Sequence, residues 1–156
     1  MITIKGVLGE GFDMIQAKRV VDAISIWEQV LNSPEFKDLV LKARFSQTNE
    51  TSQKIFDTYT AVQDKTAKYE INRVPNGSET AATNTVTGVT TLQVIWINKA
   101  SVYDLVNTIA HEYSHTPEGG GYVHSYLGWG PWRNRAWSVP YQLGDIVQRI
   151  AEEKKL

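Results

Sequence analysis

The sequence predicts an α+β domain that occupies residues 1–156, with helices at both ends of the chain and a small sheet between them. Apolar residues recur at helical spacing over residues 12–62, which predicts helices in the first part of the chain. Segments rich in Thr and Val follow and predict a sheet that is mixed or antiparallel. Helical spacing returns after residue 101, and a chain of 156 residues can form one compact core.

Three helices are expected before the sheet. The first spans residues 12–32, where the apolar positions fall on one helical face. The second spans residues 33–45, because Ser33 is a typical N-cap and Pro34 suits the first helical position. The third spans residues 51–62 and opens at a threonine N-cap. The residues predicted to face inward are Ile15, Val20, Ile24, Trp27 and Leu31, then Phe36, Leu39 and Val40, and finally Ile55, Phe56 and Tyr59.

The middle of the chain has the residue composition of strands and turns. Lys68–Val74 alternates apolar and polar residues, and Pro75–Ser78 has the composition of a turn. Thr83–Thr91 is rich in β-branched residues, and Leu92–Asn98 is the strongest strand candidate in the chain. We expect these segments to form the sheet.

A helix, a long loop and a last helix are expected after the sheet. Ser101 and Asp104 form a capping-box pattern that opens a helix, and this helix leads directly into residues 111–115. Residues 117–137 are rich in Gly, Trp and Tyr, which predicts a long structured loop of the kind that is often functional. The last helix is predicted from about residue 140 to residue 153.

Composition excludes several classes of function. Hydrophobic residues make up 42% and charged residues 21% of the chain, as in ordinary globular proteins. The net charge of -1 gives no reason to expect a nucleic acid or a membrane surface as partner. The absence of cysteine excludes disulfides, thiolate metal ligands and cysteine nucleophiles. The beginning of the chain has no apolar signal segment and no stretch reaches transmembrane length, so we expect a cytoplasmic protein.

The segment from His111 to His115 reads H-E-x-x-H on a predicted helix. Residues four apart stand on one helical face, so both imidazoles can bind one metal ion. Glu112 follows His111 directly, which directs its carboxylate to the open side of the metal, where it can act as general base on a bound water. Imidazole ligands on a hydrolytic motif favour Zn²⁺ as the cofactor. The alternative is a helix with two surface histidines.

His124 is the predicted third metal ligand. Pro117 should end the helix, and the glycines Gly119–Gly121 allow the tight turn that brings His124 back. Three nitrogen ligands and a water would complete a tetrahedron around zinc. Glu118 and Asp145 are the rival ligands, and Asp145 could instead orient a ligand imidazole or lie on the helix surface. His124 could also be a loop residue bonded only to backbone.

The motif and the residues after it resemble the zincin metallopeptidases, and among them the metzincin pattern H-E-x-x-H-x-x-G-x-x-H. The segment between the second and third histidines is three residues longer than in that pattern. The methionine of the metzincin Met-turn is missing, since the chain contains only Met1 and Met14. Ser138-Val139-Pro140-Tyr141 stands at the corresponding place, as in small, mostly uncharacterised bacterial zinc-peptidase-like proteins.

The resemblance implies a zincin-like fold and a zinc metallopeptidase that hydrolyses amide bonds of a peptide or protein, with peptidoglycan peptides among the candidate substrates. It implies that Leu92–Asn98 is the sheet edge along which an extended peptide pairs. It also implies that Tyr141 donates its hydroxyl to the developing oxyanion. The alternative for Tyr141 is a residue at the start of the last helix that packs on the core.

Two further groups of side chains could belong to a substrate pocket. Trp129, Trp132 and Trp137 could wall the pocket, or they could cover a small core. Arg133 and Arg135 could bind a substrate carboxylate, or they could be solvated. The alternative to the peptidase is a catalytically inactive metal-binding or interaction domain that keeps the zincin site.

Overall fold

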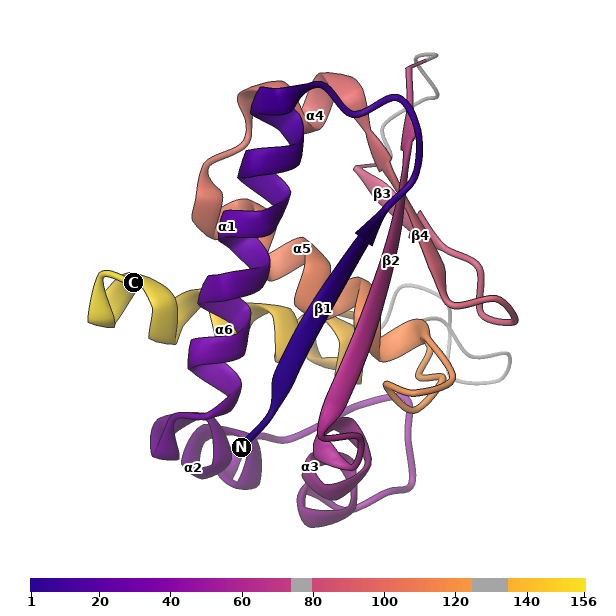
Figure 1. Ribbon diagram of the computed structural model, residues 1–156. Helices are drawn as coiled ribbons and strands as arrows, with labels where there is room; N and C mark the ends of the chain where they lie inside the picture. The colour runs from indigo at the N-terminus through magenta and orange to yellow at the C-terminus, as the bar shows by residue number, and fades with distance from the viewer. Residues whose placement is uncertain (74–79, 125–134) are drawn as a thin grey trace.

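The computed structural model describes residues 1–73, 80–124 and 135–156, and the structural statements below refer to these residues. They form an α+β fold, as predicted (Figure 1). The elements in chain order are β1 (Thr3–Leu8), α1 (Met14–Leu31), α2 (Pro34–Lys42), α3 (Ser52–Thr60), β2 (Asp64–Asn72), β3 (Ala81–Thr83), β4 (Val89–Gln93), α4 (Val94–Lys99), α5 (Val102–His115), a 3-10 helix (Arg135–Trp137) and α6 (Val139–Lys154).

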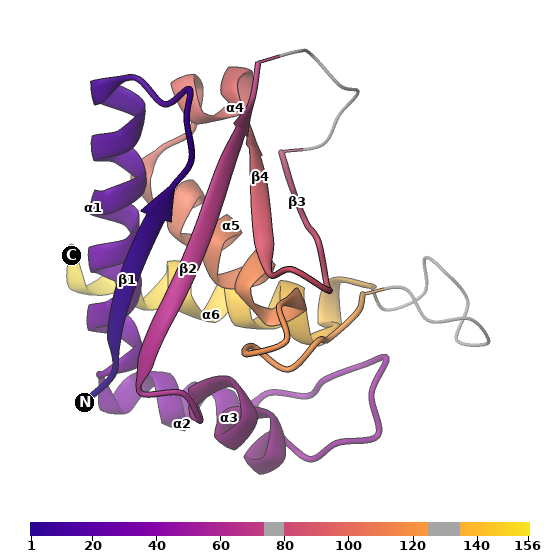
Figure 2. The ribbon, with the colours of Figure 1, turned by 45° about the vertical axis from the view of Figure 1, so that its right-hand side comes forward.

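The sheet is mixed, with the strand order β1-β2-β4-β3. β1 pairs with β2 and β2 pairs with β4 in parallel, whereas β3 pairs with β4 antiparallel. Of the two sheet types predicted, the mixed one is confirmed. Helices α1, α5 and α6 lie behind the sheet in Figure 2. Residues of β2 alternate between exposed and buried, because the helices cover only one face of the sheet.

The prediction of a strand over Leu92–Asn98 is wrong. β4 ends at Gln93, and the following residues form the short helix α4. Periodicity cannot distinguish a strand from a helix in such a short apolar run, so tertiary contacts decide. Helix α1 supplies them, because Gln16 Nε2 donates to Asn98 Oδ1 at 3.0 Å and Arg19 donates to the carbonyl of Ala100. β4 is also an inner strand, so the free sheet edge beside α5 is β3.

β1 was not predicted. Its partner β2 lies about sixty residues later in the chain, as the pair Thr3 and Asp64 shows. No local turn pattern therefore predicts that β1 is a strand. Helix α1 covers the outer edge of β1. Glu28 accepts from the backbone N–H of Ile4 at 2.6 Å, and Asn32 accepts from that of Ile2 at 2.8 Å. These bonds satisfy backbone groups that an edge strand would otherwise leave unpaired.

The three predicted N-terminal helices are present, with small shifts at their ends. α2 begins at Pro34, and α3 begins after Thr51, whose hydroxyl accepts from the backbone N–H of Lys54. Most of the predicted inward-facing residues are buried or partly buried. Ile15 is the exception, because it is 74% exposed. The Asp13 capping box sets the phase of α1 so that the side chain at position 16 faces inward instead.

Helix α5, which carries the motif, lies at the centre of the core. Its N-terminus is capped by Ser101, as predicted, and its residues Leu105, Val106, Ile109 and Ala110 are fully buried. Gly144 lets α6 approach α5 closely, since a Cβ atom there would lie 2.4 Å from Asn107 Oδ1. The described helices include none that is both long enough and apolar enough to cross a membrane.

Candidate metal centre

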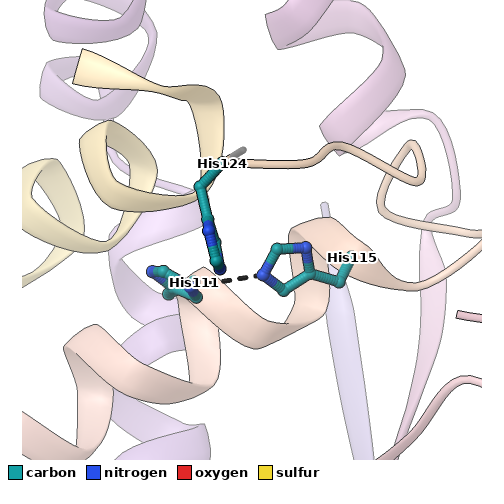
Figure 3. Close-up of side chains that lie close together, drawn as sticks. All are labelled: His111, His115 and His124. Carbon is teal, nitrogen blue, oxygen red and sulfur yellow. Dashed lines mark hydrogen bonds between the residues drawn. The ribbon is translucent and has the colours of Figure 1, made fainter. Parts of the chain in front are cut away.

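The structure brings together the three predicted histidine ligands. His111 and His115 lie on successive turns of α5, and His124 reaches them from the loop that follows (Figure 3). One ring nitrogen from each lies within 4.8 Å of the other two. Among the described residues, neither Asp145 nor Glu118 belongs to this cluster. Asp145 instead accepts from Asn107 Nδ2 at 3.0 Å, and Glu118 accepts from the Tyr113 hydroxyl at 3.3 Å.

The spacing of two of the nitrogens fits a tetrahedral metal ion. His111 Nε2 and His115 Nε2 are 3.3 Å apart. Two ligands at the usual zinc–nitrogen distance of about 2.0–2.1 Å are separated by roughly 3.3–3.4 Å in a tetrahedron. His115 Nδ1 lies 2.6 Å from the carbonyl oxygen of Tyr122. A carbonyl only accepts, so Nδ1 carries the hydrogen and the lone pair of Nε2 faces the cluster.

The third histidine has an unsatisfied nitrogen. His124 Nδ1 is buried, and it has no hydrogen-bond partner among the described residues. Buried polar atoms without a partner are rare, and each calls for a physical explanation. A metal ion bound through Nδ1 would satisfy this atom. The three residues could therefore hold a metal ion.

Burial keeps two of the imidazoles neutral. Burial lowers the pKa of His111 to about 3, and the neighbouring histidines and Arg135 add to this effect. Burial also lowers the pKa of His124 to about 4, with contributions from His115 and Arg135. Both side chains are therefore unprotonated at neutral pH, and their lone pairs can bind a metal cation.

A glycine turn brings His124 to the helix, as predicted. Thr116 ends α5, and its carbonyl accepts from the backbone N–H of Gly121 at 2.9 Å. Gly120 and Gly121 have φ angles of 114° and 64°, which side chains rarely tolerate. The turn is fastened to a distant loop, because the Tyr122 hydroxyl donates to Glu50 Oε2 at 2.6 Å. His115 is thus linked through Tyr122 to Glu50.

Glu112 lies beside the cluster with its carboxylate held in place. Its Oε1 is 3.9 Å from His111 Nε2. Its Oε2 accepts from the hydroxyl of Thr83 on β3 at 2.5 Å, and that hydroxyl lies 2.8 Å from the hydroxyl of Thr90. Glu112 is only 6% exposed. The edge strand therefore fixes the orientation of the predicted general base.

Tyr141 lies at the same cluster, in the first turn of α6. The centre of its ring is 4.6 Å from that of His111 and 5.3 Å from that of His124. The Arg135 Cζ atom lies 5.4 Å from the centre of the same ring. Both predicted roles of Tyr141, as hydroxyl donor and as packing residue, are compatible with this place.

A cavity of about 620 Å³ opens over the cluster. Its lining residues are Thr80, Ala81, Ala82, Thr83, Thr85, Asn107, Thr108, His111, Glu112, His115, His124, Arg135 and Tyr141. Trp137 is 56% exposed, and it is not among the described residues that line this cavity. Trp129, Trp132 and Arg133 lie outside the described residues.

Several residues of the site were not predicted from the sequence. These are Thr83 and Asn107 in the cavity wall, and Tyr122 and Glu50 behind the ligands. Thr83 lies in a Thr-rich segment where nothing distinguishes it from its neighbours. The glycine turn indicated that residues after it return to the helix, but it did not indicate which atom would bind the ligand histidine.

No model of a known protein family matches this sequence, and no curated protein matches it. What this chain does must therefore follow from the chemistry of the histidine cluster and of the residues around it.

Proposed function

We propose that this protein is a zinc-dependent peptidase that hydrolyses amide bonds in a peptide or protein substrate. The observation that carries this proposal is the cluster of His111, His115 and His124 with the buried carboxylate of Glu112 beside it. Three imidazoles with a fourth position left for water are a typical donor set for catalytic zinc. A buried carboxylate next to such a position is suited to act as general base.

The arrangement around the cluster also supports a zincin-like fold. The motif helix α5 lies against a mixed sheet whose edge strand β3 is antiparallel to its neighbour. Residues 80–83, on and next to this strand, line the cavity. An extended peptide would therefore pair with β3, and not with the segment Leu92–Asn98 that the resemblance implied. This placement would bring a backbone amide of the substrate over the histidines.

The side chains of the site would divide the chemical work as follows. A zinc ion on the three imidazoles supplies a Lewis acid that acidifies a water molecule and polarises the substrate carbonyl. Glu112 takes a proton from the attacking water at its Oε1, while the Thr83 hydroxyl holds Oε2. As the carbon–nitrogen bond breaks, Glu112 passes this proton to the leaving amine. The Tyr141 hydroxyl donates to the carbonyl oxygen as negative charge develops there.

Metal analysis and peptide hydrolysis together test the proposal. We expect near-stoichiometric zinc in the purified protein and less zinc in the variants His115→Ala and His124→Ala. A peptide library read by mass spectrometry should show cleavage that a chelator abolishes and added zinc restores. Glu112→Gln should keep the zinc and lose about 10²–10⁴ of the rate.

Glu118→Gln is the matched control, because Glu118 is exposed and lies outside the cluster. Full activity in Glu112→Gln would refute the mechanism. Bound zinc without hydrolysis of any peptide would favour the inactive metal-binding domain. Absence of zinc binding, even after zinc is added, would remove the basis of both functions.

A further inference from the structure

We propose that Arg135 makes the cavity selective for substrates that carry a carboxylate close to the amide bond to be cleaved. That the bound substrate is cleaved rests on the proposed peptidase function. The binding preference itself depends only on the cavity and its charge. The chemistry recognised is a carboxylate, which a peptide can supply as its C-terminus or as an Asp or Glu side chain. The observations that lead to this assignment are the place of Arg135, its charge and the neutrality of the other walls.

The first observation is the place of Arg135 in the cavity wall. It lies on the 3-10 helix that precedes α6, and it lines the cavity together with the three histidines. Both its guanidinium and the ring of His111 lie near the ring of Tyr141, since the Arg135 Cζ atom is 5.4 Å and the His111 ring centre is 4.6 Å from the centre of that ring. The backbone is anchored there, since the carbonyl of Arg135 accepts from the Ser138 hydroxyl at 2.6 Å and from its N–H at 3.0 Å.

The second observation is the distribution of charge. Apart from the histidines, the ionisable groups among the described lining residues with a charge at neutral pH are Glu112 and Arg135. Thr83 already holds the carboxylate of Glu112. With a divalent cation bound, positive charge would exceed negative charge in the cavity.

The third observation is the chemistry of the remaining walls. The other polar side chains among the described lining residues are uncharged, and they are Thr80, Thr85, Asn107, Thr108 and Tyr141. A guanidinium is always charged and offers two parallel N–H groups that match a carboxylate. In a partly enclosed cavity, such a charge-assisted pair contributes more than it does on an open surface. The wall therefore favours an anionic group of the substrate at Arg135.

Binding of three matched peptides tests the preference. The probes are N-acetylated alanine-rich tetrapeptides that differ only in charge. One has a free C-terminal carboxylate, one has a C-terminal amide, and one has a C-terminal amide with glutamate in the chain. Their dissociation constants are measured by NMR titration of the zinc-loaded Glu112→Gln protein, which prevents turnover, and of the metal-free protein, which removes direct binding of the carboxylate to zinc.

We expect at least one carboxylate peptide to bind about tenfold more tightly than the uncharged peptide, since a hydrogen bond to a charged group has at least that effect. Which of the two binds identifies the source of the carboxylate. Arg135→Gln should remove this preference and leave the affinity for the uncharged peptide unchanged, whereas Arg135→Lys should keep part of it. Arg149→Gln is the matched control, because Arg149 is exposed on α6 and pairs with Glu153.

Equal affinity for the three peptides, no binding of any of them, or a preference that survives Arg135→Gln in both metal states would overturn the inference. These results are distinct from a failure of the proposed function. A carboxylate preference that depends on Arg135, in a protein that cleaves no peptide, would support the binding preference and count against the peptidase. Cleavage without any carboxylate preference would support the peptidase and overturn the role of Arg135.

Discussion

Removing one hydroxyl that lies behind the histidine cluster should weaken zinc binding. Tyr122→Phe deletes the hydroxyl that donates to Glu50 Oε2 at 2.6 Å. Burial and the bond to Glu50 raise the pKa of Tyr122, so the hydroxyl keeps its proton and donates at any neutral pH. The backbone carbonyl of the same tyrosine accepts from His115 Nδ1 at 2.6 Å. A looser Tyr122 therefore orients the ligand imidazole less well.

The size of the effect follows from the kind of bond that is lost. A hydrogen bond to a charged group contributes about 1.5–3 kcal/mol. Glu50 is exposed to solvent, so the lower end of this range applies. If the whole loss falls on the metal-bound state, about 1.5 kcal/mol corresponds to roughly a tenfold weaker zinc affinity. Changes in the partners of metal ligands typically cost about 10–100-fold in affinity, which agrees with this value.

Competition with a chromophoric zinc chelator measures the dissociation constant directly. Glu50→Gln should shift it in the same direction as Tyr122→Phe, and the double variant should add little to either change, because both remove one bond. Tyr103→Phe is the matched control, since its hydroxyl donates to the carbonyl of Leu156 at 3.4 Å, away from the cluster. Unchanged zinc affinity in both Tyr122→Phe and Glu50→Gln, with the fold intact by circular dichroism, would refute this reasoning.

Three further outcomes are expected. Thr83→Val should lower kcat for peptide hydrolysis without changing the zinc content, because it removes the hydroxyl that holds the carboxylate of Glu112. Thr83→Ser should keep the rate of the wild type. Equal kcat in the wild type and both variants would contradict this prediction. Gly144→Ala should lower the free energy of unfolding, measured by urea denaturation, by about 1–3 kcal/mol, because the new Cβ would clash with Asn107. A stability equal to that of the wild type would show that α5 and α6 separate at no cost. Burial lowers the pKa of Lys65 from its ordinary value of 10.5 to about 8, partly offset by the charge of Glu118. Between these two values the unfolded chain binds more protons than the folded one, so the free energy of unfolding should gain a contribution that grows from pH 8 to pH 10.5, and Lys65→Met should lack it in urea titrations.

The sequence alone determined what depends on neighbours along the chain. Helix α5 and its Ser101 cap follow from local periodicity and capping chemistry. The juxtaposition of His111 and His115 follows from helix geometry, which places residues four apart on one face. The return of His124 follows from a short turn whose positive φ angles suit Gly120 and Gly121. The core of the candidate site could therefore be predicted.

Only the tertiary structure decided what depends on distant partners. β1 is a strand because β2 pairs with it, and residues 94–99 are a helix because side chains of α1 hold their end. The identity of β3 as the edge strand depends on the order of the strands in the sheet, which no local pattern encodes. The bonds from Thr83 to Glu112 and from Tyr122 to Glu50 join residues 29 and 72 positions apart. Such contacts form only once the whole chain is packed, because burial and backbone pairing at a distance determine them.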